Sequence, residues 1–168
     1  LLANSPHPDL AVWRAALLAQ RNYEVDTRMA ADFSANDLKK YDLVVLHQLP
    51  SSKYLIQSVV DEINKQQIPK IFLTGYQTDL YAFNKAQTLL NIDYTGNRSP
   101  NEVTMIYNPG FNSFNTSEEL RSKLGTFSPL LSPFGEYAAS PSAQILAYQK
   151  IGQVDTEFPL ILMGETND

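Results

Sequence analysis

The stretch YDLVVLHQLP, residues 41–50, contains an unbroken aliphatic run from Leu43 to Leu46. A run of this kind is typical of a parallel strand that is covered on both faces. A second run, Ile71 to Leu73, follows after a helical pattern in which Leu55, Val59 and Ile63 share one face. Ser51 or Ser52 is expected to cap this helix. The succession of buried strand, helix and buried strand predicts an α/β domain with an open, mostly parallel sheet.

The residues before this stretch predict two more strands and a helix. Residues 1–4 are expected to form strand one, and Leu10, Trp13 and Leu17 have the spacing of a helix face. Polar and apolar residues alternate from Tyr23 to Met29, which favours a strand near an edge of the sheet. We therefore expect the order 2-1-3-4, with strands one, three and four central.

The second half of the chain has a looser pattern. A capping-box sequence at Thr116 to Glu119 predicts a helix that ends at Gly125. Residues 145–151 and 158–163 are expected to form a late β-hairpin around Gly152. The 168 residues fit a single domain, 1–168. Because both ends resemble strands in progress, we expect this domain to belong to a longer chain.

Composition excludes several classes of function. The net charge of −5 and the lack of a basic cluster argue against nucleic acid as a partner. The chain has no cysteine, which rules out disulfides, thiolate metal sites and a cysteine nucleophile. No phosphate-binding loop, dinucleotide fingerprint or serine elbow is present in the sequence. We expect no cofactor.

Polar residues follow three of the predicted strands. In open parallel sheets, ligands bind outside the carboxyl ends of the strands. The candidate site at this rim consists of His7, Asp9, His47, Thr74, Tyr76 and Gln77. With the order 2-1-3-4, strands one and three are neighbours, so His7 and His47 should share one rim. They could be metal ligands or an acid/base pair with Asp9, or they could be structural residues.

The segment Ile68 to Gln77 resembles the strand and turn that carry the nucleophile in class I glutamine amidotransferase-like domains. The segments 2–9, 41–50 and 149–154 are similar to such domains in large membrane-anchored bacterial proteins with von Willebrand A-like or BatA-type regions. The resemblance implies a three-layer, flavodoxin-like fold. In that family a cysteine lies at the turn where Thr74 or Gly75 stands here, and a late histidine is also missing from this chain.

Two functions follow as expectations. The first is a non-catalytic scaffold or partner-binding module of a bacterial envelope protein, with no catalytic residue and no metal. The resemblance implies that this domain is located in the periplasm or on the outer face of the cytoplasmic membrane. The partners would be other envelope proteins or other domains of the same chain, without direct membrane contact by this domain.

The alternative is a hydrolase or sugar-modifying enzyme that uses a His/Asp/Tyr rim site. Imidazoles within reach of a common ligand in an open pocket would favour the enzyme. Rings far apart, or one ring packed in the core, would favour the scaffold. We expect Pro8 and the start of the helix to constrain the direction of the Asp9 carboxylate. A tetrahedral metal site that also includes His47 would then be fortuitous.

Overall fold

The computed structural model describes residues 1–94 and 99–165. The chain forms two compact units, Leu1–Ala86 and Gln87–Asp168, and each is described by itself. The first unit contains strands, α-helices and 3₁₀ helices in the order β1 (Leu2–Ala3), α1 (Pro8–Leu18), β2 (Arg28–Met29), η1 (Ala30–Asp32), η2 (Ala35–Lys40), β3 (Val44–His47), α2 (Gln57–Lys65), β4 (Lys70–Leu73) and α3 (Leu80–Ala86).

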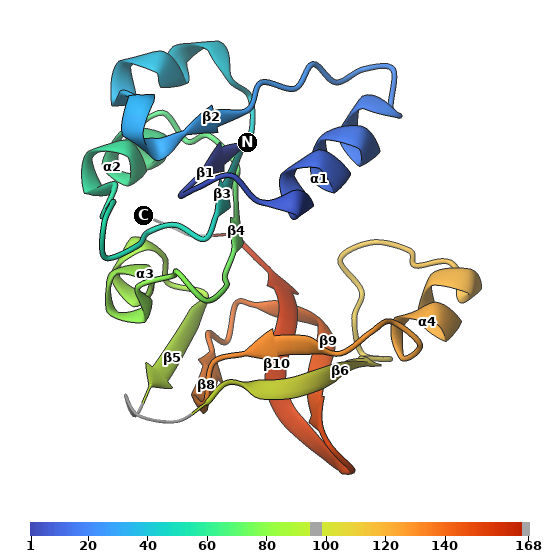
Figure 1. The fold of residues 1–168 in the computed structure, drawn as a ribbon. Helices are drawn as coiled ribbons and strands as arrows, with labels where there is room; N and C mark the ends of the chain where they lie inside the picture. Colours follow the sequence, from blue (N-terminus) through green and yellow to red (C-terminus); the bar gives the residue numbers. More distant parts are fainter. Residues whose placement is uncertain (95–98, 166–168) are drawn as a thin grey trace. The chain divides into compact units, whose positions relative to one another are not determined.

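A four-stranded parallel sheet with the order β2-β1-β3-β4 forms the centre of the first unit (Figure 1). In its register Leu2 and Ala3 of β1 pair with Leu46 and His47 of β3. All four residues of β3 are buried, as expected of an interior strand. The predicted strand order is therefore confirmed. Strand β2 lies at an edge as expected, but only Arg28 and Met29 of the alternating stretch 23–29 belong to it.

Strand β4 differs from the expectation that it is central. Among the described residues β4 pairs only with β3, so it is the other edge of the sheet. Ile71 is 37% exposed, and Phe72 and Leu73 are only partly buried. The expectation was wrong because a short aliphatic run does not distinguish a strand covered on both faces from an edge strand with partial cover.

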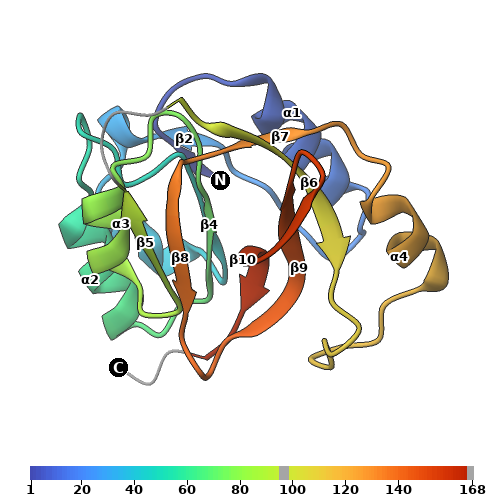
Figure 2. The same cartoon turned by 90° about the horizontal axis from the view of Figure 1, so that it is seen from below.

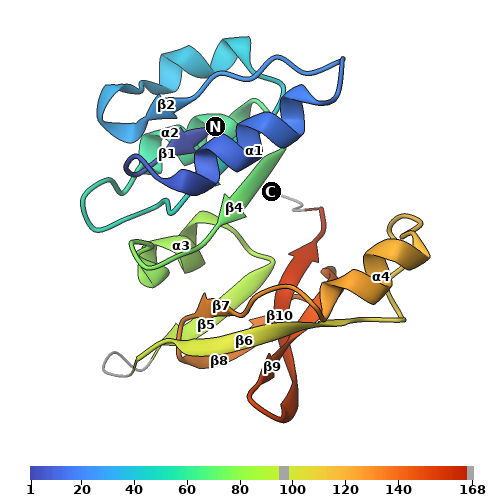
Figure 3. The same cartoon turned by 45° about the vertical axis from the view of Figure 1, so that its right-hand side comes forward.

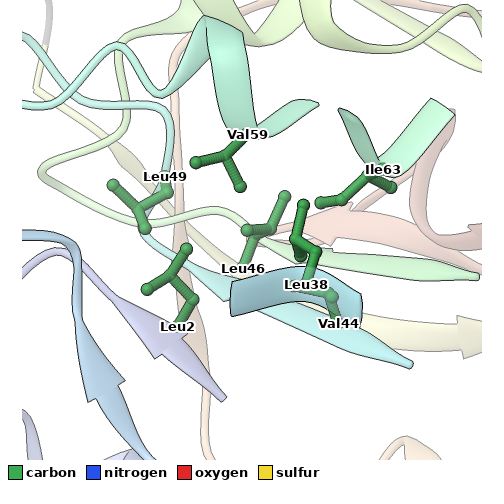
Figure 4. Close-up of a cluster of buried hydrophobic side chains, with 7 residues drawn as sticks. All are labelled: Leu2, Leu38, Val44, Leu46, Leu49, Val59 and Ile63. Carbon is green, nitrogen blue, oxygen red and sulfur yellow. The ribbon is translucent and has the colours of Figure 1, made fainter. Parts of the chain in front are cut away.

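A cluster of seven aliphatic side chains connects the sheet to α2 and η2 (Figure 4). Its members come from β1, β3, the residues after β3, η2 and α2: Leu2, Leu38, Val44, Leu46, Leu49, Val59 and Ile63. Leu38, Leu46, Leu49 and Ile63 are completely shielded from solvent. Burial of their apolar surface, at about 25 cal/mol per Å², is the main contribution of this cluster to stability.

Helix α2 begins later than its sequence predicts. Its N-cap is Ile56, which has a left-handed φ of 50° and no capping side chain. Ser51 does not cap the helix, because its Oγ donates to Asn4 Oδ1 at 2.8 Å and accepts from the Tyr54 N–H at 3.0 Å. As a result Leu55 lies outside the helix and is 56% exposed rather than part of its buried face.

The second unit is mainly antiparallel. It contains β5 (Leu90–Tyr94), β6 (Asn101–Tyr107), α4 (Glu118–Leu124), β7 (Leu130–Ser132), β8 (Gly135–Ala139), β9 (Gln144–Ile151) and β10 (Val154–Met163). One sheet has the order β10-β9-β6-β7, with β9 between β10 and β6 (Figure 2). Strands β5 and β8 form a separate pair (Figure 3). The structure confirms the late hairpin β9–β10 and the helix that Ser117 caps and Gly125 ends.

Strand β10 lies at the edge of its sheet and pairs irregularly. Its register against β9 shifts between Asp155 and Pro159, between Pro159 and Ile161, and between Ile161 and Leu162. The buried Gln149 of β9 donates from Nε2 to the Pro159 carbonyl at 3.0 Å. Bulges of this kind twist a strand and interrupt its ladder of backbone hydrogen bonds.

Among the residues that the structure describes, no helix has the length and apolar character that crossing a bilayer requires.

Candidate functional site

His47 is the last residue of β3 and lies at the carboxyl end of the parallel sheet. Its backbone pairs with Ala3, and its carbonyl accepts a hydrogen bond from the Asn4 N–H at 3.1 Å. The side chain belongs to a run of four buried residues and is itself only 3% exposed. Strand pairing therefore fixes the His47 imidazole beside the residues that follow β1.

His7 and Asp9 lie at the start of α1, four and six residues after β1 ends. His7 is the N-cap: its Nδ1 accepts a hydrogen bond from the Asp9 N–H at 3.3 Å. Pro8 occupies the first helical turn, where the proline's missing N–H leaves no intrahelical bond unmade. Asp9 also lies in that turn, where a carboxylate interacts favourably with the helix dipole.

The Asp9 carboxylate connects the two histidines. Its Oδ2 lies 3.3 Å from His7 Nδ1 and 3.6 Å from His47 Nε2. The two imidazole centroids are 4.9 Å apart with their planes tilted by 44°. The structure thus brings His7, Asp9 and His47 together at one rim, as the strand order implied. The two rings are within reach of a common ligand, which favours the enzyme, but the His47 ring is buried, which favours the scaffold.

Burial lowers the pKa of His47 below its usual value of 6.5, since the charged imidazolium loses water. The Asp9 carboxylate opposes this shift, and the neighbouring His7 adds to it. The buried Nδ1 of His47 has no hydrogen-bond partner among the described residues. The neutral imidazole is therefore favoured in the folded protein.

The turn after β4 is held by side chains of residues 48 and 78. The Gly75 N–H donates to Thr78 Oγ1 at 3.0 Å, and the Gln77 N–H donates to Gln48 Oε1 at 3.1 Å. A Cβ atom added at Gly75 would lie 2.9 Å from Gln48 Cδ, so the Gln48 side chain packs directly against the turn. Two backbone donors of this turn are thus bonded to the side chains of Thr78 and Gln48.

Of the three predicted site residues in this turn, only Gln77 is hydrogen-bonded to the other strand ends. Its Oε1 accepts from Asn4 Nδ2 and, at 2.9 Å, from Ser5 Oγ. Thr74 is exposed, and Tyr76 is 95% exposed. No hydrogen bond joins either side chain to His7, Asp9 or His47 in the described part of the chain.

The candidate site chosen from the sequence left out four polar residues that form hydrogen bonds at the rim: Asn4, Ser5, Gln48 and Ser51. Each follows a predicted strand within a few residues, the same signal that selected His7 and Gln77. Small polar residues after strands are common in turns, so their types alone did not distinguish them.

The lowered pKa of His47 predicts a pH dependence of stability. An imidazole with a lower pKa in the folded state is protonated more readily in the unfolded chain. Its contribution to stability is therefore present above the unfolded-state pKa of about 6.5 and is lost as the pH falls through the folded-state pKa. We expect the midpoint of urea unfolding of metal-free protein to fall between pH 7.5 and 5 more steeply than in a His47→Gln variant. Equal pH slopes for the two proteins would contradict this assignment.

The chain was also compared with known proteins. No family model matches it, and no curated protein and no solved structure is significantly similar to it.

Proposed function

We propose that the chain is an amidotransferase-like module that binds a partner and does not hydrolyse glutamine. The observation that carries the proposal is the turn after β4, where Gly75 and Gln77 use their N–H groups on Thr78 and Gln48. A glutaminase needs a nucleophile at such a turn and free backbone donors for the oxyanion. This turn offers no thiol, because the chain contains no cysteine, and two of its backbone donors are already occupied by Thr78 and Gln48.

The proposal includes a three-layer, flavodoxin-like arrangement of the first unit. Its support is the parallel order β2-β1-β3-β4 with α1 between β1 and β2 and α2 between β3 and β4. Right-handed crossovers in this order would place α1 and α2 on opposite faces of the sheet. A place in a bacterial envelope protein, outside the cytoplasmic membrane, rests on the resemblance of segments 2–9, 41–50 and 149–154. The partner would then be another envelope protein or another domain of the same chain.

Ammonia release from L-glutamine tests the proposal. We expect the rate with purified protein to equal that of a blank without protein, because a threonine hydroxyl at the turn has no comparable acidity to a thiol. A Thr74→Ala variant provides the matched control, since this exposed side chain can be removed without opening the core. Ammonia production above the blank that disappears in Thr74→Ala would show that the turn is catalytic and would refute the proposal.

The cluster of His7, Asp9 and His47 favours a second candidate, a hydrolase that uses these residues for acid–base chemistry. A neutral buried imidazole beside a carboxylate, 3.6 Å away, can accept a proton from water or a hydroxyl group. Chromogenic esters, phosphate esters and glycosides would test this candidate. Turnover that falls by at least about 100-fold in His47→Gln is the expected result for a general base, and turnover unchanged by that substitution would reject the candidate.

A further inference from the structure

We propose that His7, Asp9 and His47 form a binding site for one divalent transition-metal ion, with zinc as the ion that fits best. The proposal goes beyond the partner-binding function, which assigns no metal. It also departs from the sequence-based expectation of no metal, which rested on the constrained direction of the Asp9 carboxylate.

The distances within the cluster are those of a metal site. A tetrahedral ion with bonds of about 2.1 Å separates its ligand atoms by about 3.4 Å. Asp9 Oδ2 lies 3.3 Å from a nitrogen of His7 and 3.6 Å from a nitrogen of His47. One ligand atom from each of the three residues lies within 4.8 Å of the other two. Only the two histidine nitrogens need to approach each other, and the His7 side chain is exposed.

Hydrogen bonds do not explain why His7 Nδ1 and the Asp9 carboxylate face each other. Because Nδ1 accepts a hydrogen bond from the Asp9 N–H, it carries no proton to donate to Asp9 Oδ2. Two atoms with lone pairs therefore lie 3.3 Å apart. A cation between them would bind both lone pairs and replace the N–H as the partner of Nδ1.

The buried His47 side chain is a second, independent indication. Its Nδ1 has no partner among the described residues, and its Nε2 is 3.6 Å from Asp9 Oδ2, which is longer than a hydrogen bond. Buried polar side chains are normally hydrogen-bonded, so a buried imidazole whose Nδ1 has no partner among the described residues is unusual. A metal ion at Nε2 would satisfy the nitrogen that faces the open end of the sheet.

The type of ligand decides the kind of ion. Two imidazoles and one carboxylate suit zinc and its transition-metal neighbours, whereas magnesium and calcium prefer oxygen ligands. Three protein ligands leave at least one position for water or for an oxygen atom of a partner. Since His7 and Asp9 lie at the start of α1 and His47 ends β3, the ion would also join the helix start to the sheet.

Zinc titration of tag-free, chelator-treated protein tests the proposal. The sequence has only two histidines and no cysteine, so little other binding by soft ligands is expected. We expect one zinc ion per chain by isothermal titration calorimetry and a rise of several degrees in the melting temperature, because binding to the folded state stabilises it. Cobalt(II) should give the visible absorption spectrum of a low-symmetry site.

Variants at the two exposed ligands make the test specific. We expect Asp9→Asn and His7→Gln to weaken zinc binding by at least about tenfold. Loss of a residue that only hydrogen-bonds to a metal ligand already lowers metal affinity by about that factor, and loss of a ligand itself should lower it at least as much. Neither side chain is buried, so both variants should fold, as circular dichroism can verify. Asp42→Asn, at an exposed aspartate outside the cluster, is the matched control and should bind like the parent protein.

Two outcomes would overturn the proposal. One is the lack of zinc binding at millimolar concentrations in correctly folded protein. The other is binding with equal affinity in the parent protein, Asp9→Asn and His7→Gln. Both outcomes are independent of the glutamine assay, which examines the turn after β4 and uses no metal, so failure of the metal site and failure of the proposed function can be distinguished.

Discussion

Replacing Leu46 with alanine is expected to lower the free energy of unfolding by about 2–5 kcal/mol. Leu46 is completely buried in the interior strand β3 and belongs to the cluster that joins the sheet to α2 and η2. Truncation removes apolar contacts and leaves a cavity, and neighbours held by strand pairing on both sides of β3 can fill that cavity only in part. Equilibrium urea unfolding, followed by circular dichroism, measures the loss.

Leu55→Ala is the matched control for this experiment. It removes the same atoms from a side chain that is 56% exposed and that lies outside α2. We expect a change within about 0.5 kcal/mol, as for most surface substitutions. If the two variants lost equal stability, the cluster around Leu46 would not be the core of the first unit.

Gly135→Ala is expected to destabilise the second unit by about 2 kcal/mol or more, at or above the middle of the range for overpacking. A Cβ atom at Gly135 would lie 2.4 Å from the carbonyl oxygen and 3.1 Å from the carbonyl carbon of Asp93. Both contacts are with backbone atoms of β5, which pairs with β8 at this position. Because no side chain can rotate away, the strands themselves must separate.

Gly125→Ala is the control for this substitution. The nearest atom to its Cβ would be the Met105 carbonyl oxygen at 3.7 Å, and its φ of −73° suits any residue. We expect its stability to stay within about 0.5 kcal/mol of the parent protein. Hydrogen exchange at the β5 and β8 amides would locate the damage. Unchanged protection there in Gly135→Ala would contradict the close approach of the two strands.

The sequence predicted the first unit better than the second. The order of its four strands was predicted, but the short aliphatic run of β4 did not reveal that this strand lies at an edge. The start of α2 was not predictable from Ser51, because that hydroxyl bonds to Asn4, 47 residues earlier in the chain. The pairing of β5 with β8 joins segments about 45 residues apart, and a local pattern carries no information about such a partner.

For the candidate site, the sequence could place the backbone but not the side chains. The positions of His7 and His47 after neighbouring strands followed from the strand order. The orientation of Asp9 depends on its rotamer in the first turn of α1, which pattern and spacing do not specify. The rim contacts of Gln77 with Asn4 and Ser5 likewise required the three strand ends to be positioned first.

The irregular strand β10 has a consequence for self-association. An exposed edge strand with a continuous row of free N–H and C=O groups can act as a template for a strand of another molecule, which leads to aggregation. Pro159 has no N–H to offer, and Asp155 and Glu157 add negative charge to the same strand. Together with the register shifts, these residues make this edge of the sheet a poor template for intermolecular β-pairing.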